Sequence, residues 1–74
     1  MEVRVLLRDG THLEGRLYAD SQLQKQLATK YAINEYFSKM YNRVYFRSKC
    51  LTGSFRAIDV DFWELTGSRV QLGE

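Results

Sequence analysis

Hydrophobic and polar residues alternate over residues 2–20, which predicts a β-hairpin. Side chains two positions apart point to the same face of a strand, and the apolar residues fall on one parity in each half of this segment. Asp9-Gly10 lies between the halves and is a strong turn signal, because Gly10 can adopt the positive φ that a three-residue loop needs. Pairing apolar with apolar residues places Val3 opposite Leu17. The predicted strands span residues 2–8 and 11–19.

A helical spacing replaces this alternation over residues 21–41. Leu23, Leu27 and Tyr31 recur at four-residue intervals, which places them on one face of a helix. Ser21, followed three residues later by a glutamine, is typical of a capping box at a helix start. We therefore predict one helix, inserted between the second and third strands.

Alternation returns at "NRVYFRSKC", where one parity is basic and aromatic and the other is mostly apolar. The basic parity holds Arg43, Tyr45, Arg47 and Lys49. This pattern predicts a strand whose polar face is turned either to solvent or to a polyanion. Strand-like segments follow up to the end of the chain. The remaining predicted strands span residues 43–51, 55–65 and 69–73.

The register of the second predicted hairpin decides whether this polar face is turned to solvent or to a polyanion. Pairing apolar with apolar residues puts Phe46 opposite Val60. On the other face it puts Arg47 opposite Asp59 and Tyr45 opposite Asp61. Opposite charges across two strands contribute roughly 0.2–1 kcal/mol for each pair, so this register neutralises part of the basic face. We favour that interpretation, in which Arg43, Lys49 and Arg56 still keep no acidic partner and leave a reduced basic patch.

Charge is distributed unevenly along the chain. The 74 residues carry a net charge of +2, and seven basic residues against one acidic residue give residues 25–56 a charge of +6. A basic middle segment favours a polyanionic partner such as nucleic acid. The length fits a single domain over residues 1–74 with a small core, and an apolar fraction of 45% is typical of a globular chain.

Residues with distinctive chemistry are few. The chain has one histidine, His12, and one cysteine, Cys50, which excludes a zinc site built from several such ligands within one chain. Asp59 and Asp61 share a predicted strand face, where two carboxylates are more often solvated than metal-bound. The sequence contains neither a nucleophile–base motif nor a phosphate-binding glycine loop. We therefore expect a protein that is not an enzyme and that uses no cofactor or metal.

Hydropathy along the chain indicates no membrane partner. The sequence has no apolar run near the roughly 18 residues that a membrane-spanning helix needs. Nothing in it reads as a secretory leader, and a lone cysteine suits a reducing compartment. We expect a cytoplasmic protein.

Two segments of the chain resemble the motifs of Sm and Sm-like (LSm) proteins. "VRVLLRDGTHLEGRL" is similar to the first motif, in which alternating strands flank an Asp-Gly turn and Leu13 and Gly15 fall at motif positions. Its continuation, "DSQLQ", has Gln24 where the family has asparagine. "LTGSRVQL" is similar to the second motif, with Thr66 where the family has arginine.

The resemblance implies a mainly β fold with one helix, in the form of a five-stranded, strongly bent Sm-like (SH3-like) barrel. Members of the family often assemble into rings through the edges of their last two strands, and many bind single-stranded RNA. We therefore expect a non-enzymatic homo-oligomer that binds single-stranded RNA. The RNA-binding residues implied by the motifs are Leu23, Gln24, Thr66 and Gly67, and the basic strand adds Arg43, Tyr45, Arg47 and Lys49.

A fainter likeness, to Rof-type inhibitors of the Rho terminator, leaves a second function open. Those inhibitors are Sm-like barrels that bind a protein, which implies an adaptor or inhibitor of the kind that phages encode. Aromatic residues on the predicted helix and on the last strands suit a protein interface as well as they suit base stacking. The expected interface residues are Trp63, Tyr36 and Tyr41.

Overall fold

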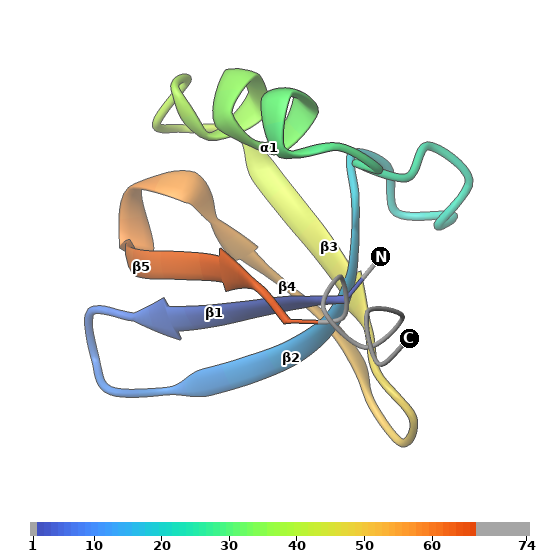
Figure 1. Cartoon of the computed structure of the whole chain (residues 1–74), viewed down its shortest axis with the longest axis horizontal. Coiled ribbons are helices and arrows are strands. Elements are labelled where there is room, and N and C mark those ends of the chain that lie inside the picture. Colours follow the sequence, from blue (N-terminus) through green and yellow to red (C-terminus); the bar gives the residue numbers. More distant parts are fainter. Residues whose placement is uncertain (1, 67–74) are drawn as a thin grey trace, which may run out of the picture.

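The computed structural model describes residues 2–66 as a mainly β fold with one helix, which confirms the fold class at that level (Figure 1). The helix lies between the second and third strands, as expected. The predicted strand at 69–73 lies outside the described residues. Within residues 2–66, no helix is long and apolar enough to span a bilayer. The elements are β1 (Val3–Leu7), β2 (His12–Tyr18), α1 (Lys30–Phe37), β3 (Arg43–Arg47), β4 (Thr52–Arg56), the 3-10 turn η1 (Ala57–Asp59) and β5 (Val60–Leu65).

The five strands form one antiparallel sheet in the order β4-β3-β2-β1-β5. β4 and β5 are the two edges, and no pairing joins them in the described part of the chain, so the sheet is not closed there. Figure 1 shows β3 and β4 crossing β1, β5 and the first part of β2 steeply, with α1 above them. The sheet is therefore strongly folded upon itself around β2, its central strand.

Gly15 marks the point at which β2 changes partner. It lies opposite Val3 of β1, and the next residue, Arg16, lies opposite Arg47 of β3. A Cβ atom placed on Gly15 would lie 2.3 Å from the backbone oxygen of Arg47, which is far inside van der Waals contact. The two backbones can approach this closely only because residue 15 has no side chain.

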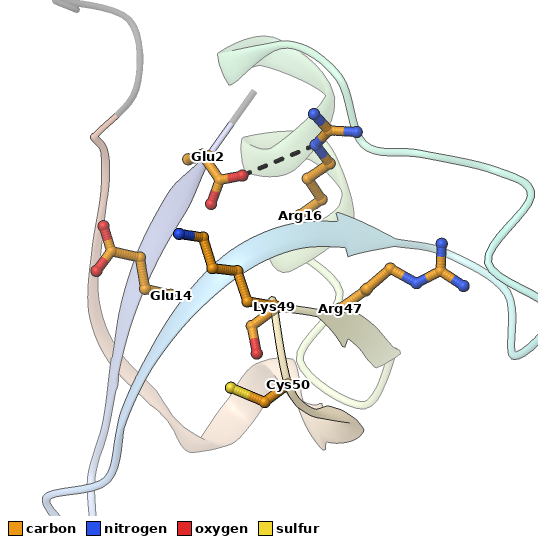
Figure 2. Close-up of a pocket in the computed structure, with 7 residues that line it drawn as sticks. Glu2, Glu14, Arg16, Arg47, Lys49 and Cys50 are labelled. Carbon is orange, nitrogen blue, oxygen red and sulfur yellow. Dashed lines mark ion pairs between the residues drawn. The ribbon is translucent and has the colours of Figure 1, made fainter.

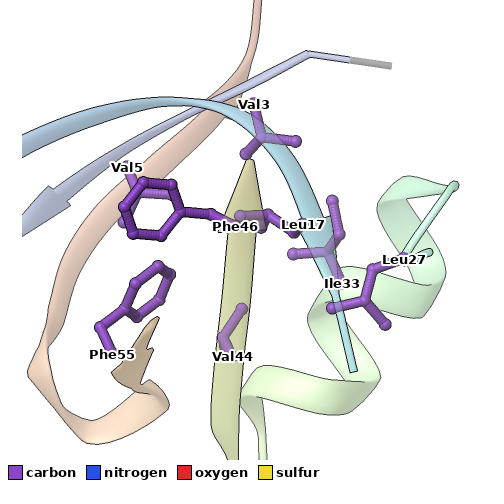
Figure 3. Close-up of a cluster of buried hydrophobic side chains, with 8 residues drawn as sticks. All are labelled: Val3, Val5, Leu17, Leu27, Ile33, Val44, Phe46 and Phe55. Atoms are coloured by element: carbon purple, nitrogen blue, oxygen red, sulfur yellow. The ribbon is translucent and has the colours of Figure 1, made fainter. Parts of the chain in front are cut away.

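The core fills the concave side of the sheet beneath α1 (Figure 3). Ile33 is fully buried and is the residue through which α1 enters this core. Phe37 extends the contact, with its ring edge-on to Phe55 at a centroid distance of 6.3 Å and to Trp63 at 5.9 Å. The buried cluster consists of Val3, Val5, Leu17, Leu27, Ile33, Val44, Phe46 and Phe55.

The first hairpin forms with a register two residues away from the predicted one. Val3 lies opposite Gly15 rather than Leu17. The loop is Arg8-Asp9-Gly10, and Gly10 has the expected positive φ, at 93°. Because the shift is even, side-chain parity is unchanged and the same apolar residues are buried.

The helix is much shorter than the predicted range of 21–41. It begins after Thr29, whose hydroxyl oxygen accepts a hydrogen bond of 3.0 Å from the backbone N–H of Ala32. The preceding segment is held by the Asp20 carboxylate, which accepts hydrogen bonds from the N–H groups of Gln24 at 2.9 Å and Lys25 at 2.6 Å. A side chain that satisfies the backbone in this way competes with helix formation.

The predicted pairing of 43–51 with 55–65 is wrong. β3 pairs with β4, so that Phe46 lies opposite Gly53 rather than Val60, and β5 pairs with β1. η1 separates β4 from β5, which divides the predicted strand at 55–65 into two. This topology removes the acidic partners that the predicted register supplied to β3.

Candidate nucleic-acid interface

The outer face of β2, β3 and β4 carries arginines opposite arginines. Arg16 of β2 lies opposite Arg47 of β3, and Arg43 of β3 lies opposite Arg56 of β4. All four side chains are exposed. Like charges directly opposite each other destabilise a sheet, so the free protein carries an electrostatic cost at both positions.

Tyr45 lies between the two arginine pairs on the same parity of β3. Its partly exposed side chain is flanked across the sheet by Tyr18 of β2 and Ser54 of β4. The Arg43 guanidinium donates a hydrogen bond of 3.0 Å to the hydroxyl of Ser54, which orients it along this face. We call this surface the arginine face and define it by Arg16, Arg43, Tyr45, Arg47 and Arg56.

The acidic residues expected to neutralise β3 lie elsewhere. Asp59 belongs to η1, where its backbone oxygen accepts a hydrogen bond of 2.8 Å from the N–H of Arg8. Asp61 falls at the irregularity where Leu6 pairs with Phe62 and Leu7 pairs with Val60. The basic parity of β3 therefore keeps its charge.

Two ion pairs occur within residues 2–66, and one of them reaches the arginine face. Arg4 of β1 and Glu64 of β5 are 2.9 Å apart, and neither is among the residues that define this face. Arg16 and Glu2 are 3.8 Å apart, with both side chains about half exposed, so this contact is weak. Arg43, Arg47 and Arg56 make no ion pair within the described residues.

An open groove of about 600 Å³ adjoins one end of the arginine face (Figure 2). Arg16 and Arg47 line it together with Lys49, which follows β3. Glu2 and Glu14 also line the groove, and Figure 2 shows the Lys49 side chain extending toward them. The groove thus brings two predicted RNA-binding residues, Arg47 and Lys49, together with Arg16.

Leu23, Gln24 and Thr66, which the Sm motifs implied, are not among the residues that line this groove. Leu23 adopts a φ of 58°, and it and Gln24 lie in the segment held by Asp20, outside any helix. Thr66 is buried just beyond β5, with its N–H donating to the backbone oxygen of Glu2 at 3.0 Å. Gly67 lies outside the described residues.

Backbone hydrogen bonds set the ionisation of Asp20. Burial alone acts to raise the pKa of this carboxyl, but the N–H groups of Lys25 and Gln24 outweigh it and hold the pKa below its ordinary value. The carboxylate form of Asp20 therefore shapes the segment that carries Leu23 and Gln24.

The three predicted interface residues differ in exposure. Trp63 lies opposite fully buried Val5 and packs against the core, because the irregularity at Asp61 reverses the parity on which its exposure was expected. The Tyr36 hydroxyl donates to the backbone oxygens of Arg43 at 2.9 Å and Ala19 at 3.2 Å. Burial, with smaller effects from Tyr45 and Asp20, raises the pKa of Tyr36. Tyr41 is 76% exposed.

Sequence reasoning missed Arg16 as a candidate site residue and left Arg56 outside the candidate set. β2 and β3 are separated in the sequence by the whole segment that contains α1. Alternation within a strand does not reveal a partner strand so far away in the chain. The useful signal was local. No acidic residue falls on the basic parity of β3 itself, and this absence pointed to a charged surface.

A scan of protein-family models, a search of curated proteins and a search of solved structures each found no match. Among residues 2–66, no cluster of three or more histidine, cysteine, aspartate or glutamate side chains is placed to hold a metal ion. The arginine face is therefore the feature of the molecule that points to a function.

Proposed function

We propose that this chain is a non-enzymatic protein that binds single-stranded RNA through the arginine face. The observation that carries the proposal is the pair of like-charge contacts, Arg16 opposite Arg47 and Arg43 opposite Arg56, on one exposed surface. Phosphates of a bound strand would remove the repulsion that the free protein carries there. Tyr45, between the pairs, offers a ring on which an unpaired base can stack.

We further propose that the sheet belongs to a strongly bent Sm-like barrel and that the protein assembles as a ring of identical subunits. The unpaired edges, β4 and β5, are the last two strands described, which are the edges that the resemblance implies for ring contacts. Arg56 of β4 and Asp61 of β5 give these edges opposite charges, which suits head-to-tail association. A monomeric mass by light scattering at micromolar concentration would refute the ring.

Fluorescence anisotropy tests RNA binding directly. Labelled U-rich and A-rich RNA should bind at low salt and weaken steeply as salt is raised. The double variant R43Q/R47Q should bind at least about tenfold more weakly, because each lost charged contact with a phosphate is worth more than about 1 kcal/mol.

The matched control is Arg4→Gln. Arg4 is also an exposed arginine on a strand, but it pairs with Glu64 and is not one of the residues that define the arginine face. This variant should bind RNA within about twofold of the unmodified protein, although it changes net charge by the same amount as each single substitution. No binding at low salt, or binding without a salt dependence, would reject the proposed function.

A second candidate function is a protein-binding adaptor or inhibitor of the kind that phages encode. It is favoured by exposed apolar side chains on and after α1, where Tyr31 and Tyr41 are 74% and 76% exposed and Met40 is 53% exposed. A pull-down from nuclease-treated lysate separates the two functions. A partner that remains bound after nuclease supports the adaptor, and loss of every partner excludes it.

A further inference from the structure

From the arginine face we infer a binding mode, which rests on the proposed function: each arginine pair holds one phosphate of a single strand, and the strand lies along β3 with a base on Tyr45. The pairs are Arg16 with Arg47 and Arg43 with Arg56. A single phosphate placed between two guanidinium groups can receive hydrogen bonds from both of them.

The spacing along β3 suits two separate phosphates. Arg43 and Arg47 are four residues apart in one strand, which corresponds to about 13 Å at about 3.3 Å per residue. A stacked nucleic acid strand rises about 3.4 Å per nucleotide, so about four stacked nucleotides cover this distance, and an extended strand covers it with fewer. Two phosphates held by the pairs therefore belong to different nucleotides.

Tyr45 determines which nucleic acids fit. It is placed midway between Arg43 and Arg47 on the same face, so a strand held at both pairs passes over it. Only an unpaired base can turn its flat face onto the ring, and stacking is tolerant of base identity. The mode therefore favours single strands over duplexes and reads little sequence.

Among residues 2–66, carboxylates adjoin only one of the two pairs, so the pairs are unequal. Glu2 lies 3.8 Å from Arg16, and Glu14 lines the same groove. Arg43 and Arg56 have no carboxylate partner in the described part of the chain. We expect the Arg43–Arg56 position to contribute more affinity, and we expect Glu2→Gln to strengthen RNA binding by about two- to threefold at low salt.

Double-mutant cycles test the pairing with a labelled uridine octamer as the probe. Each arginine is replaced by glutamine singly, within the pairs as R16Q/R47Q and R43Q/R56Q, and between pairs as R43Q/R47Q. Within a pair the combined loss of affinity should fall short of the product of the single losses by about threefold or more, because both side chains act on one phosphate. Between pairs the losses should multiply, because the sites are further apart than direct coupling reaches.

A second set of measurements changes the Tyr45 side chain and compares a single-stranded with a duplex ligand. Tyr45→Thr should weaken binding about tenfold, whereas Tyr45→Phe, which keeps the ring, should bind as the unmodified protein does. A duplex of the same length should bind more weakly than the single strand. Thermal unfolding of each variant confirms that it is folded, and Arg4→Gln remains the binding control.

The outcomes separate this inference from the proposed function. Losses that multiply within both pairs would overturn the two-phosphate mode while RNA binding through the arginine face stands. RNA binding that none of the four arginine substitutions weakens would overturn both the mode and the arginine face as the binding surface. Equal binding of single strand and duplex would likewise reject the role of Tyr45. Failure of the unmodified protein to bind any RNA at low salt would reject the function and the mode together.

Discussion

Replacing Arg56 with glutamate reverses the charge opposite Arg43, and we expect the free protein to become more stable. In the structure these two side chains are directly opposite across β3 and β4, and both are exposed. Arg56 makes no side-chain capping bond to η1, so the substitution sacrifices no hydrogen bond there. The change removes one like-charge contact and creates one attractive contact.

The expected gain follows from cross-strand pair energies. Each of the two effects is worth roughly 0.2–1 kcal/mol, and solvent exposure favours the lower half of that range. We expect the free energy of unfolding to rise by about 0.5–1 kcal/mol in low salt. For a domain of this size, about 1 kcal/mol moves the melting temperature by about 4–8 °C, so the rise should be about 2–8 °C.

Thermal unfolding followed by circular dichroism at low salt measures this gain. Repeating the scan at about 1 M salt, where screening acts within about 3 Å, should remove most of the difference. Arg56→Gln should give about half the gain, because it removes the repulsion without adding attraction. Arg4→Glu is the reverse control, because it breaks the contact with Glu64 and should lower the melting temperature.

RNA affinity should change in the opposite direction to stability. Arg56→Glu places a carboxylate on the arginine face, so binding should weaken by more than it does in Arg56→Gln. A melting temperature that is unchanged or lower in the glutamate variant would show that the Arg43–Arg56 contact carries no repulsion. In that case the like-charge argument for an anionic partner fails at this position.

Three further predictions concern the framework of the sheet and helix. Gly15→Ala should cost more than about 2 kcal/mol of stability by denaturant unfolding, because its Cβ would meet the Arg47 backbone, whereas an alanine at exposed Thr52 should cost far less. Thr29→Ala should cost about 1 kcal/mol by removing the helix cap, and Thr29→Ser should restore most of it. Asp20 has a lowered pKa in the folded state, so its contribution is present above its unfolded value of 3.8 and is lost as pH falls through the folded value. Stability of the Asp20→Asn variant should therefore depend less on pH in that acidic range, and an unchanged profile would contradict this role.

Local patterns predicted the turn and the buried face of the first hairpin. Gly10 was expected at a positive φ and has one, and the parity that buries Val3 and Val5 survived a register shift because the shift is even. The helix at 21–41 failed for an equally local reason. Asp20 and Thr29 both bind backbone N–H groups, and the periodicity of the intervening residues does not reveal which of them begins the helix.

Pairing between distant strands was the part that periodicity did not predict. A single irregularity at Asp61 reverses the parity of β5, and it turned Trp63 toward the core instead of the surface. Matching apolar residues favoured β5 over β4 as the partner of β3, whereas the structure pairs β3 with β4. The sequence therefore revealed only the β3 residues of the arginine face. That Arg16 and Arg56 lie beside them is evident only in the structure.

Because β2 is hydrogen-bonded to β1 along its first half and to β3 along its second, neither half of the sheet possesses a complete set of strands without it. The amides of both halves should consequently lose their protection from hydrogen exchange in one cooperative unfolding event. A single proteolytic cut between residues 12 and 18 should unfold both halves of the sheet together.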